Sequence, residues 1–103
     1  MKHGFARKQD KNHTEIVMAF RKCGYSVLDL KNLAGGAPDI AVFHGPRFIG
    51  LFEIKTETGK LNERQMKWRE EWTGPKPAII RSIDEVLQIS TLRRSEKWTK
   101  RTT

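Results

Sequence analysis

The sequence predicts an α/β fold in which a mixed β-sheet is flanked by helices, in the order α-β-β-β-α-β-α. Three segments are each opened by an Asn or Ser that has a Glu or Gln three positions later, and apolar residues then follow at helical spacing. Short apolar runs bounded by glycine and proline lie between these segments and predict strands. At 103 residues, the chain has room for one domain with one modest core.

The first helix is expected to begin near Asn12, because Asn12 can act as a cap and Glu15 stands three positions later. Its apolar face would be formed by Ile16, Ala19, Phe20 and Cys23. Gly24 would then end the helix. Residues 1–11 are polar and basic, and we expect them to form an N-terminal arm that becomes ordered on a partner.

Three strands are expected next, over residues 25–30, 39–43 and 48–55. A loop rich in glycine and proline separates the first two strands. Residues 44–47 form a turn that joins the second and third strands as an antiparallel hairpin. The third strand is apolar on both faces until Glu53, which predicts a central position in the sheet.

The second helix is expected to begin with Asn62 as its cap and Gln65 as the capping partner, and to end at Gly74. One side of this helix would carry Leu61, Gln65, Trp68 and Trp72. Residues 77–81 then predict a fourth strand.

The third helix is expected to begin at Ser82, with Glu85 as its capping partner, and to fade near Leu92. The residues expected to face the core are Ile83, Val86 and Leu87. Residues 93–103 would form a basic C-terminal tail.

Most of the excess positive charge lies at the two ends of the chain. The formal net charge is +8; residues 1–11 hold four Lys or Arg and one Asp, and residues 93–103 hold five Lys or Arg and one Glu. Basic ends of this kind suit a polyanion, of which nucleic acid is the obvious example. Basic tails can also do no more than keep a protein in solution.

The composition excludes several other classes. No run approaches the roughly 20 apolar residues of a membrane-spanning helix, and the N-terminal residues lack the apolar segment of a secretory signal. We therefore expect a soluble, cytoplasmic protein. Cys23 is the single cysteine, so a disulfide within the chain is impossible, and a small buried residue is its expected role.

Two carboxylates and a lysine are expected to meet at one end of the hairpin. Glu53 and Lys55 stand two positions apart on one strand, so their side chains share a face, and Asp39 begins the neighbouring strand near the same end. One or two carboxylates together with a substrate phosphate are ligands that Mg²⁺ prefers. This pattern indicates a metal-dependent phosphodiesterase. The plainer alternative is that Asp39 caps its loop while Glu53 and Lys55 form a surface pair.

Short motifs around these residues resemble the virus-type replication-repair nuclease (VRR-NUC) domain of the PD-(D/E)xK nuclease superfamily. They are Gly36-Ala37-Pro38-Asp39-Ile40, Phe52-Glu53-Ile54-Lys55-Thr56, Gly59-Lys60-Leu61 and Gln65. The resemblance covers roughly residues 12–88. It implies a restriction-endonuclease-like fold and a stand-alone nuclease domain over residues 12–92, between the two basic ends.

The resemblance also implies a catalytic site. Asp39 and Glu53 would bind Mg²⁺, or Mn²⁺ in its place, with help from the main-chain carbonyl of Ile54, and Lys55 would be the catalytic lysine. Glu15 matches the acidic position of the first helix that can help to bind the metal. Gln65 matches the family's helix glutamine, which lies near the site. Glu15 and Gln65 each also fit a plain capping role.

The expected activity is cleavage of DNA that is recognised by its shape, because so short a chain holds no separate domain for reading base sequence. Stand-alone relatives resemble Holliday-junction resolvases, which implies a homodimer acting on branched DNA, a role in DNA repair and a possible phage origin, with no small-molecule cofactor. A flap or nicking nuclease, a non-catalytic DNA-binding module and a subunit of a larger phage or mobile-element complex are the alternatives. The basic residues expected to contact DNA are Lys60, Arg64, Arg93, Arg94, Lys97, Lys100 and Arg101.

Overall fold

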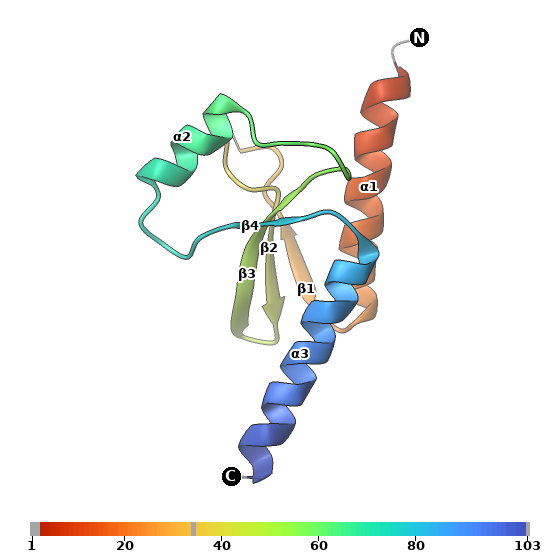
Figure 1. The fold of residues 1–103 in the computed structure, drawn as a ribbon, viewed down its shortest axis with the longest axis vertical. Coiled ribbons are helices and arrows are strands. Elements are labelled where there is room, and N and C mark those ends of the chain that lie inside the picture. Colours follow the sequence, from red (N-terminus) through yellow and green to blue (C-terminus); the bar gives the residue numbers. More distant parts are fainter. Residues whose placement is uncertain (1–2, 34, 103) are drawn as a thin grey trace.

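The computed structural model describes residues 3–33 and 35–102. Its elements are α1 (His3–Lys22), β1 (Ser26–Asp29), β2 (Ile40–His44), β3 (Arg47–Ile54), α2 (Glu63–Glu71), β4 (Ala78–Ile80) and α3 (Ile83–Thr102). The order of elements is the one predicted from the sequence (Figure 1).

The strands form one mixed sheet in the order β1-β2-β3-β4. The β1–β2 and β2–β3 pairs are antiparallel, and β3 pairs with β4 in parallel. The predicted hairpin is therefore confirmed, and its turn contains Gly45 at a φ of 58°. Because β3 has a partner on each side, it is an inner strand, as its apolar sequence predicts.

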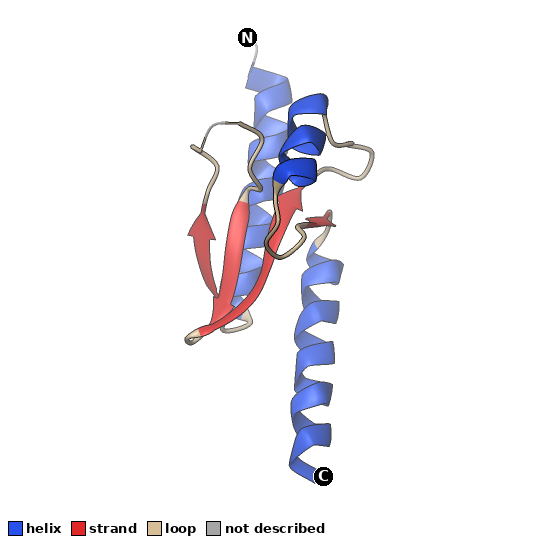
Figure 2. Ribbon diagram, turned by 90° about the vertical axis from the view of Figure 1, so that its left-hand side faces the viewer, coloured by secondary structure: helices blue, strands red, loops and turns tan. Residues whose placement is uncertain are grey.

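The core lies between α1, the sheet and the first turns of α3. Its centre is the buried Phe20 ring of α1, which packs edge-on against Tyr25 and also contacts Phe52 of β3. The buried apolar residues of this cluster are Ile16, Val17, Phe20, Tyr25, Ile40, Val42, Phe52, Ile80 and Val86. Figure 2 shows α1 behind the sheet and α2 in front of one end of it.

Helix α1 begins at His3, so the expected start at Asn12 is wrong. Asn12 lies inside the helix, where its side-chain amide donates a hydrogen bond to the Lys55 carbonyl over 2.9 Å. The segment before Asn12 extends the helix because it is rich in Ala, Arg, Lys and Gln, which favour helices without an apolar pattern. The expected end is confirmed: the helix ends at Lys22, and Gly24 adopts a φ of 94°.

Helix α2 begins with the predicted capping box, in which Asn62 and Gln65 each bond the other's backbone N–H. The helix ends at Glu71, three residues before Gly74. None of its residues is buried, so the side expected to be apolar is only partly covered. The Trp68 and Trp72 rings stack on each other, with their centroids 4.8 Å apart.

Helix α3 begins as predicted, with reciprocal hydrogen bonds between Ser82 and Glu85. It continues to Thr102, so the expectation that it fades near Leu92 is wrong, and residues 93–102 of the predicted tail are helical. Only one of the three expected core residues is buried: exposure is 0% for Val86 but 42% for Ile83 and 47% for Leu87. The reason is that the side of α3 that carries Val86 and the buried Ser90 packs on the domain, whereas Ile83 and Leu87 lie toward another side of the helix. Beyond these first turns, α3 runs past the sheet (Figure 1).

No helix in the described part of the chain is both long and apolar enough to cross a membrane.

Candidate active site

The pairing of β2 and β3 places Asp39 beside the end of β3. The Asp39 N–H donates to the Phe52 carbonyl over 3.0 Å. In return, the Ile54 N–H donates to Asp39 Oδ2 over 2.8 Å. Asp39 is therefore fixed by backbone hydrogen bonds on either side of Glu53, which confirms the closeness expected from the hairpin.

The loop that carries Asp39 packs directly against α2. Gly36 has a φ of 88°, and a Cβ atom at this position would lie 2.5 Å from the Arg64 carbonyl oxygen. Only glycine fits such a close approach in this backbone conformation. The contact holds α2, and with it Gln65, next to the ends of β2 and β3.

Glu53 is the buried carboxyl of the site, with only 4% of its surface exposed. Gln65 Nε2 donates to Glu53 Oε2 over 2.8 Å. Burial, together with the nearby charge of Asp39, raises the pKa of Glu53 to about 8, while Lys55 and Arg69 act in the opposite direction. Two neighbouring ionised carboxylates repel each other, and a cation bound between them would offset this repulsion.

Lys55 follows Glu53 at the end of β3, and its backbone is fixed on both sides. The Lys55 N–H donates to the Ile80 carbonyl over 3.1 Å, and the Lys55 carbonyl accepts the Asn12 amide described above. The side chain is half-buried and lines the same cavity as Asp39 and Glu53. The three residues on which the metal-site prediction depends are thus brought together.

The loop after β3 lies on the Lys55 side chain and is held by Arg81. Arg81 Nη1 donates to the Thr56 and Gly59 carbonyls, over 2.7 Å in each case. A Cβ atom on Gly59 would lie 3.4 Å from Lys55 Cβ and Cδ, so the loop backbone is in contact with the alkyl chain of the lysine. Arg81 therefore helps to fix the direction of Lys55.

A cavity of about 290 Å³ lies over these groups. Hydrogen-bonding and charged side chains supply most of its lining, which consists of Asn12, His13, Lys31, Asp39, Glu53, Ile54, Lys55, Thr56, Asn62 and Gln65. Five residues of this set were expected from the sequence: Asp39, Glu53, Ile54, Lys55 and Gln65.

Glu15 is not brought together with the two carboxylates. It is exposed and lines a neighbouring cavity of about 730 Å³, beside Arg81 and Glu85. Asn12 and Thr56 line both cavities, so Glu15 lies next to the site without forming part of its lining.

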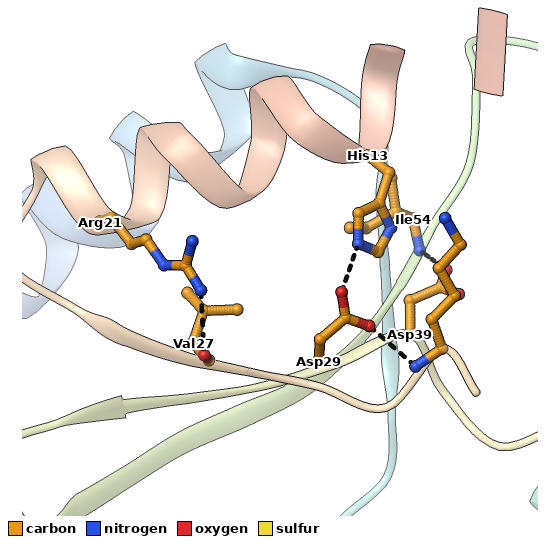
Figure 3. A network of polar contacts seen from close by, with 7 residues as sticks. His13, Arg21, Val27, Asp29, Asp39 and Ile54 are labelled. Carbon is orange, nitrogen blue, oxygen red and sulfur yellow. Dashed lines mark hydrogen bonds and ion pairs between the residues drawn. The ribbon is translucent and has the colours of Figure 1, made fainter. Parts of the chain in front are cut away.

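The α1 side chain that does line the cavity is His13. Figure 3 shows its imidazole facing Asp29 at the end of β1, with His13 Nε2 3.3 Å from Asp29 Oδ2. The Lys31 N–H donates to Asp29 Oδ1 over 2.9 Å. Burial acts to raise the pKa of Asp29, but the Lys31 N–H and the His13 ring outweigh it and lower that pKa.

His13 stands three and seven positions before the buried Ile16 and Phe20, so all three residues share one face of α1. This spacing is the sequence signal that could have placed His13 at the site. With the helix expected to begin at Asn12, the closeness of His13 to Glu15 allows an approach to the site, but a solvated position in the first turn is the favoured prediction.

The residues expected to contact DNA fall into two groups. Lys60 and Arg64 are exposed and stand two residues before and after Asn62, which lines the cavity. Arg93 lies over the Tyr25 ring, with its guanidinium carbon 5.9 Å from the ring centroid. Arg94 is exposed on α3. The more distant members Lys97, Lys100 and Arg101 lie on the far part of α3, which points away from α2 (Figure 1), and their side chains fall outside the described part.

The atoms at the site that could bind a metal ion are oxygen atoms, which are hard ligands. Among the described residues, no three His, Cys, Asp or Glu side chains gather closely enough to form a complete metal cage. Mg²⁺ does not need such a cage, because it is commonly held by one or two carboxylates, water and substrate phosphate. The Asp39 and Glu53 carboxyls with the Ile54 carbonyl fit that kind of site.

Comparison with known proteins supports the fold. No family model and no curated protein sequence matches this chain. Among solved structures, one described as a VRR_NUC domain matches with a TM-score of 0.61 and 23% sequence identity, over 80% of this chain and 92% of that chain. The mixed sheet and helices thus have the restriction-endonuclease-like arrangement of a VRR_NUC domain, as the sequence motifs predict.

Proposed function

We propose that this protein is a metal-dependent endonuclease that hydrolyses phosphodiester bonds in DNA and selects its substrate by DNA shape. The observation that carries the proposal is the convergence of Asp39, the buried Glu53 and Lys55 on one polar cavity. A fold of nuclease type supports it. A module that only binds DNA would gain nothing from two carboxylates facing a phosphate, because they repel it in the absence of a cation.

Mg²⁺ is the proposed cofactor, with Mn²⁺ as a substitute. Asp39, Glu53 and the main-chain carbonyl of Ile54 would hold the ion, and the burial of Glu53 beside a second carboxyl is the feature that fits it. When bound, the ion would polarise the phosphate and lower the pKa of a water molecule. Glu15 is left out of the proposed ligand set because it lines the neighbouring cavity.

The chain's own residues divide the remaining tasks. Lys55 would donate to a phosphate oxygen and stabilise the negative charge that develops as the phosphorus is attacked. Gln65 donates to one oxygen of Glu53 and so fixes the rotation of that carboxyl. Arg81 fixes the loop that covers the lysine.

Branched DNA is the proposed substrate, with a homodimer as the acting form. Lys60 and Arg64 beside the cavity would contact phosphates near the cut. The basic C-terminal part of α3 would reach phosphates farther away, because the molecule is 54 Å long and α3 extends along it. Two copies related by a two-fold axis would suit paired cuts in a symmetric junction, as in DNA repair or recombination.

The test is a panel of end-labelled DNAs of equal sequence: a four-way junction, a flap, a nicked duplex and a linear duplex. With Mg²⁺, the wild-type protein should cut the junction fastest, and Glu53→Gln should cut none of them. Preference for the flap or the nick would change the proposed substrate. Binding of all four DNAs without any cutting would favour the non-catalytic module.

A further inference from the structure

One rim of the active-site cavity is lined by Asn12 and His13 of α1 and by Lys31, which follows β1, and none of these side chains belongs to the proposed metal ligands. His13 contributes the imidazole there, and its side chain is only 13% exposed. Asp29 accepts from the His13 ring at one oxygen and from the Lys31 N–H at the other. Both oxygens of Asp29 are therefore engaged in holding groups of this rim in place (Figure 3).

The need to hold α1 against β1 does not by itself explain the His13–Asp29 contact. A second hydrogen bond already links these two elements, since Arg21 Nη2 donates to the Val27 carbonyl over 3.4 Å, and Arg21 does not line the cavity. The His13–Asp29 contact differs because His13 itself lines the cavity, together with Lys31 and Lys55. A carboxylate that orients a histidine at the edge of a site is a common way to fix the direction of the ring.

The chemistry of the rim fits a phosphate. A DNA strand lying across Asp39 and Glu53 brings phosphates on both sides of the scissile one close to the cavity wall. Hydrogen-bond donors are what such a phosphate needs, and the contact with Asp29 fixes the direction of the His13 ring.

We propose that His13 binds a backbone phosphate next to the scissile one, and that Asp29 is the positioning residue that holds His13 for this contact. This inference rests on the proposed nuclease function and adds to it a subsite for the DNA strand. It assigns the contribution of α1 to His13 rather than to Glu15.

The first measurement compares His13→Gln with Arg21→Gln, which removes the Arg21–Val27 hydrogen bond outside the cavity. Wild-type protein and both variants are titrated with a four-way junction in Ca²⁺, and cleavage is then followed in Mg²⁺. His13→Gln should weaken binding or raise KM by at least about tenfold, in line with loss of a hydrogen bond to a charged group. Its kcat should change less, and Arg21→Gln should match wild type.

The second measurement separates a phosphate contact from a loss of structure. Junctions carrying one uncharged methylphosphonate are prepared, with the substitution moved along the phosphates that flank the cut. For wild type, the methylphosphonate should strongly reduce junction affinity at one position. For His13→Gln, which already lacks the contact, the same substitution should reduce affinity only slightly further. At the other positions the two proteins should lose equal affinity. Because each comparison is made within one protein, a general loss of folding cancels.

Asp29→Asn is a second variant, at an exposed position. Thermal unfolding of every variant shows whether it is folded. At the phosphate identified with wild type, the methylphosphonate should cost Asp29→Asn less affinity than it costs wild type, but more than it costs His13→Gln. Equal methylphosphonate profiles for wild type, His13→Gln and Asp29→Asn would overturn the phosphate subsite while leaving the nuclease proposal intact. Absence of cutting by wild type on every junction would overturn both.

Discussion

At the scale of single residues, Glu53 is the group whose surroundings are hardest to explain without a cation. It is buried, it accepts a hydrogen bond from Gln65, and the neighbouring Asp39 carboxyl helps to raise its pKa. An ionised carboxylate in such a place costs free energy unless it is paired. We therefore predict that protonation and metal binding compete at this residue.

The pH dependence of stability follows from the raised pKa of Glu53. The pKa rises from 4.5 to about 8 in the folded protein, so between these values the folded state holds a proton that the unfolded state has lost. This contribution to the free energy of unfolding must fall as the pH rises through that window. Thermal unfolding of metal-free protein should show wild type losing more stability from pH 5 to pH 8 than Glu53→Gln does.

Added Mg²⁺ should offset this loss at pH 8 in wild type and not in Glu53→Gln, because an ion that binds only the folded state stabilises it. Parallel curves for the two proteins, with and without Mg²⁺, would show that Glu53 does not titrate as its surroundings indicate.

Lys55 is expected to act on the transition state and not on the fold. Lys55→Ala should lower kcat by about 10²–10³, the range seen when one preorganised charge-stabilising donor is removed. Its thermal midpoint should stay close to wild type, because the backbone bonds of Lys55 do not need the side chain. Its DNA affinity in Ca²⁺ should fall much less than kcat, because the lysine acts mainly on the charge of the transition state. Unchanged turnover in a well-folded variant would remove the lysine from the mechanism.

At the scale of elements, the position of α2 depends on the glycine at 36. Gly36→Ala should destabilise the protein by about 1–3 kcal/mol more than Gly35→Ala, because overpacking costs roughly that amount. Both glycines have a φ of 88°, but only at Gly36 would the new Cβ meet the backbone of α2. Chemical denaturation of the two variants measures the difference.

Cleavage should also fall in Gly36→Ala, since displacement of α2 moves Gln65 away from Glu53. Equal stability and equal activity in the two alanine variants would mean that the close approach of loop and helix is not needed.

The far part of α3 is expected to bind DNA without supporting the core. Arg93 packs over Tyr25, so a truncation should begin after Arg94. Removing residues 95–103 should weaken junction binding and reduce its salt dependence, by about 0.9 in the logarithmic slope for each duplex phosphate that the shortened protein can no longer neutralise. The thermal midpoint should change little, and a matching collapse of stability would show that this helix end is structural.

At the scale of the whole molecule, local patterns predicted the order of elements because each pattern had a local physical cause. The Asn62–Gln65 and Ser82–Glu85 caps involve neighbouring residues only, and the β2–β3 hairpin needs only a short turn. Asp39, Glu53 and Lys55 could be placed together because strand alternation and hairpin pairing fix them.

The features that the sequence did not predict depend on contacts between distant segments or on helix formation without an apolar stripe. Residues 3–11 extend α1 without an apolar pattern of their own, so His13 lies inside the helix rather than in its first turn, and it lines the cavity. The place of Glu15 in a neighbouring cavity depends on how α1 crosses the sheet. The exposure of Leu87 depends on which side of α3 packs on the domain, since the neighbouring Val86 is fully buried.

The central claim is that Asp39 and Glu53 share a divalent cation needed for DNA cleavage, and its most direct test is one set of reactions on a labelled four-way junction. Wild type, Asp39→Asn and Glu53→Gln are compared across a Mg²⁺ titration and in excess chelator, after equal folding has been shown. We predict that wild type cuts the junction with increasing Mg²⁺, that chelator abolishes cutting, and that each variant is at least about 100-fold slower. Cutting by wild type in excess chelator, or wild-type rates in both variants, would contradict this claim.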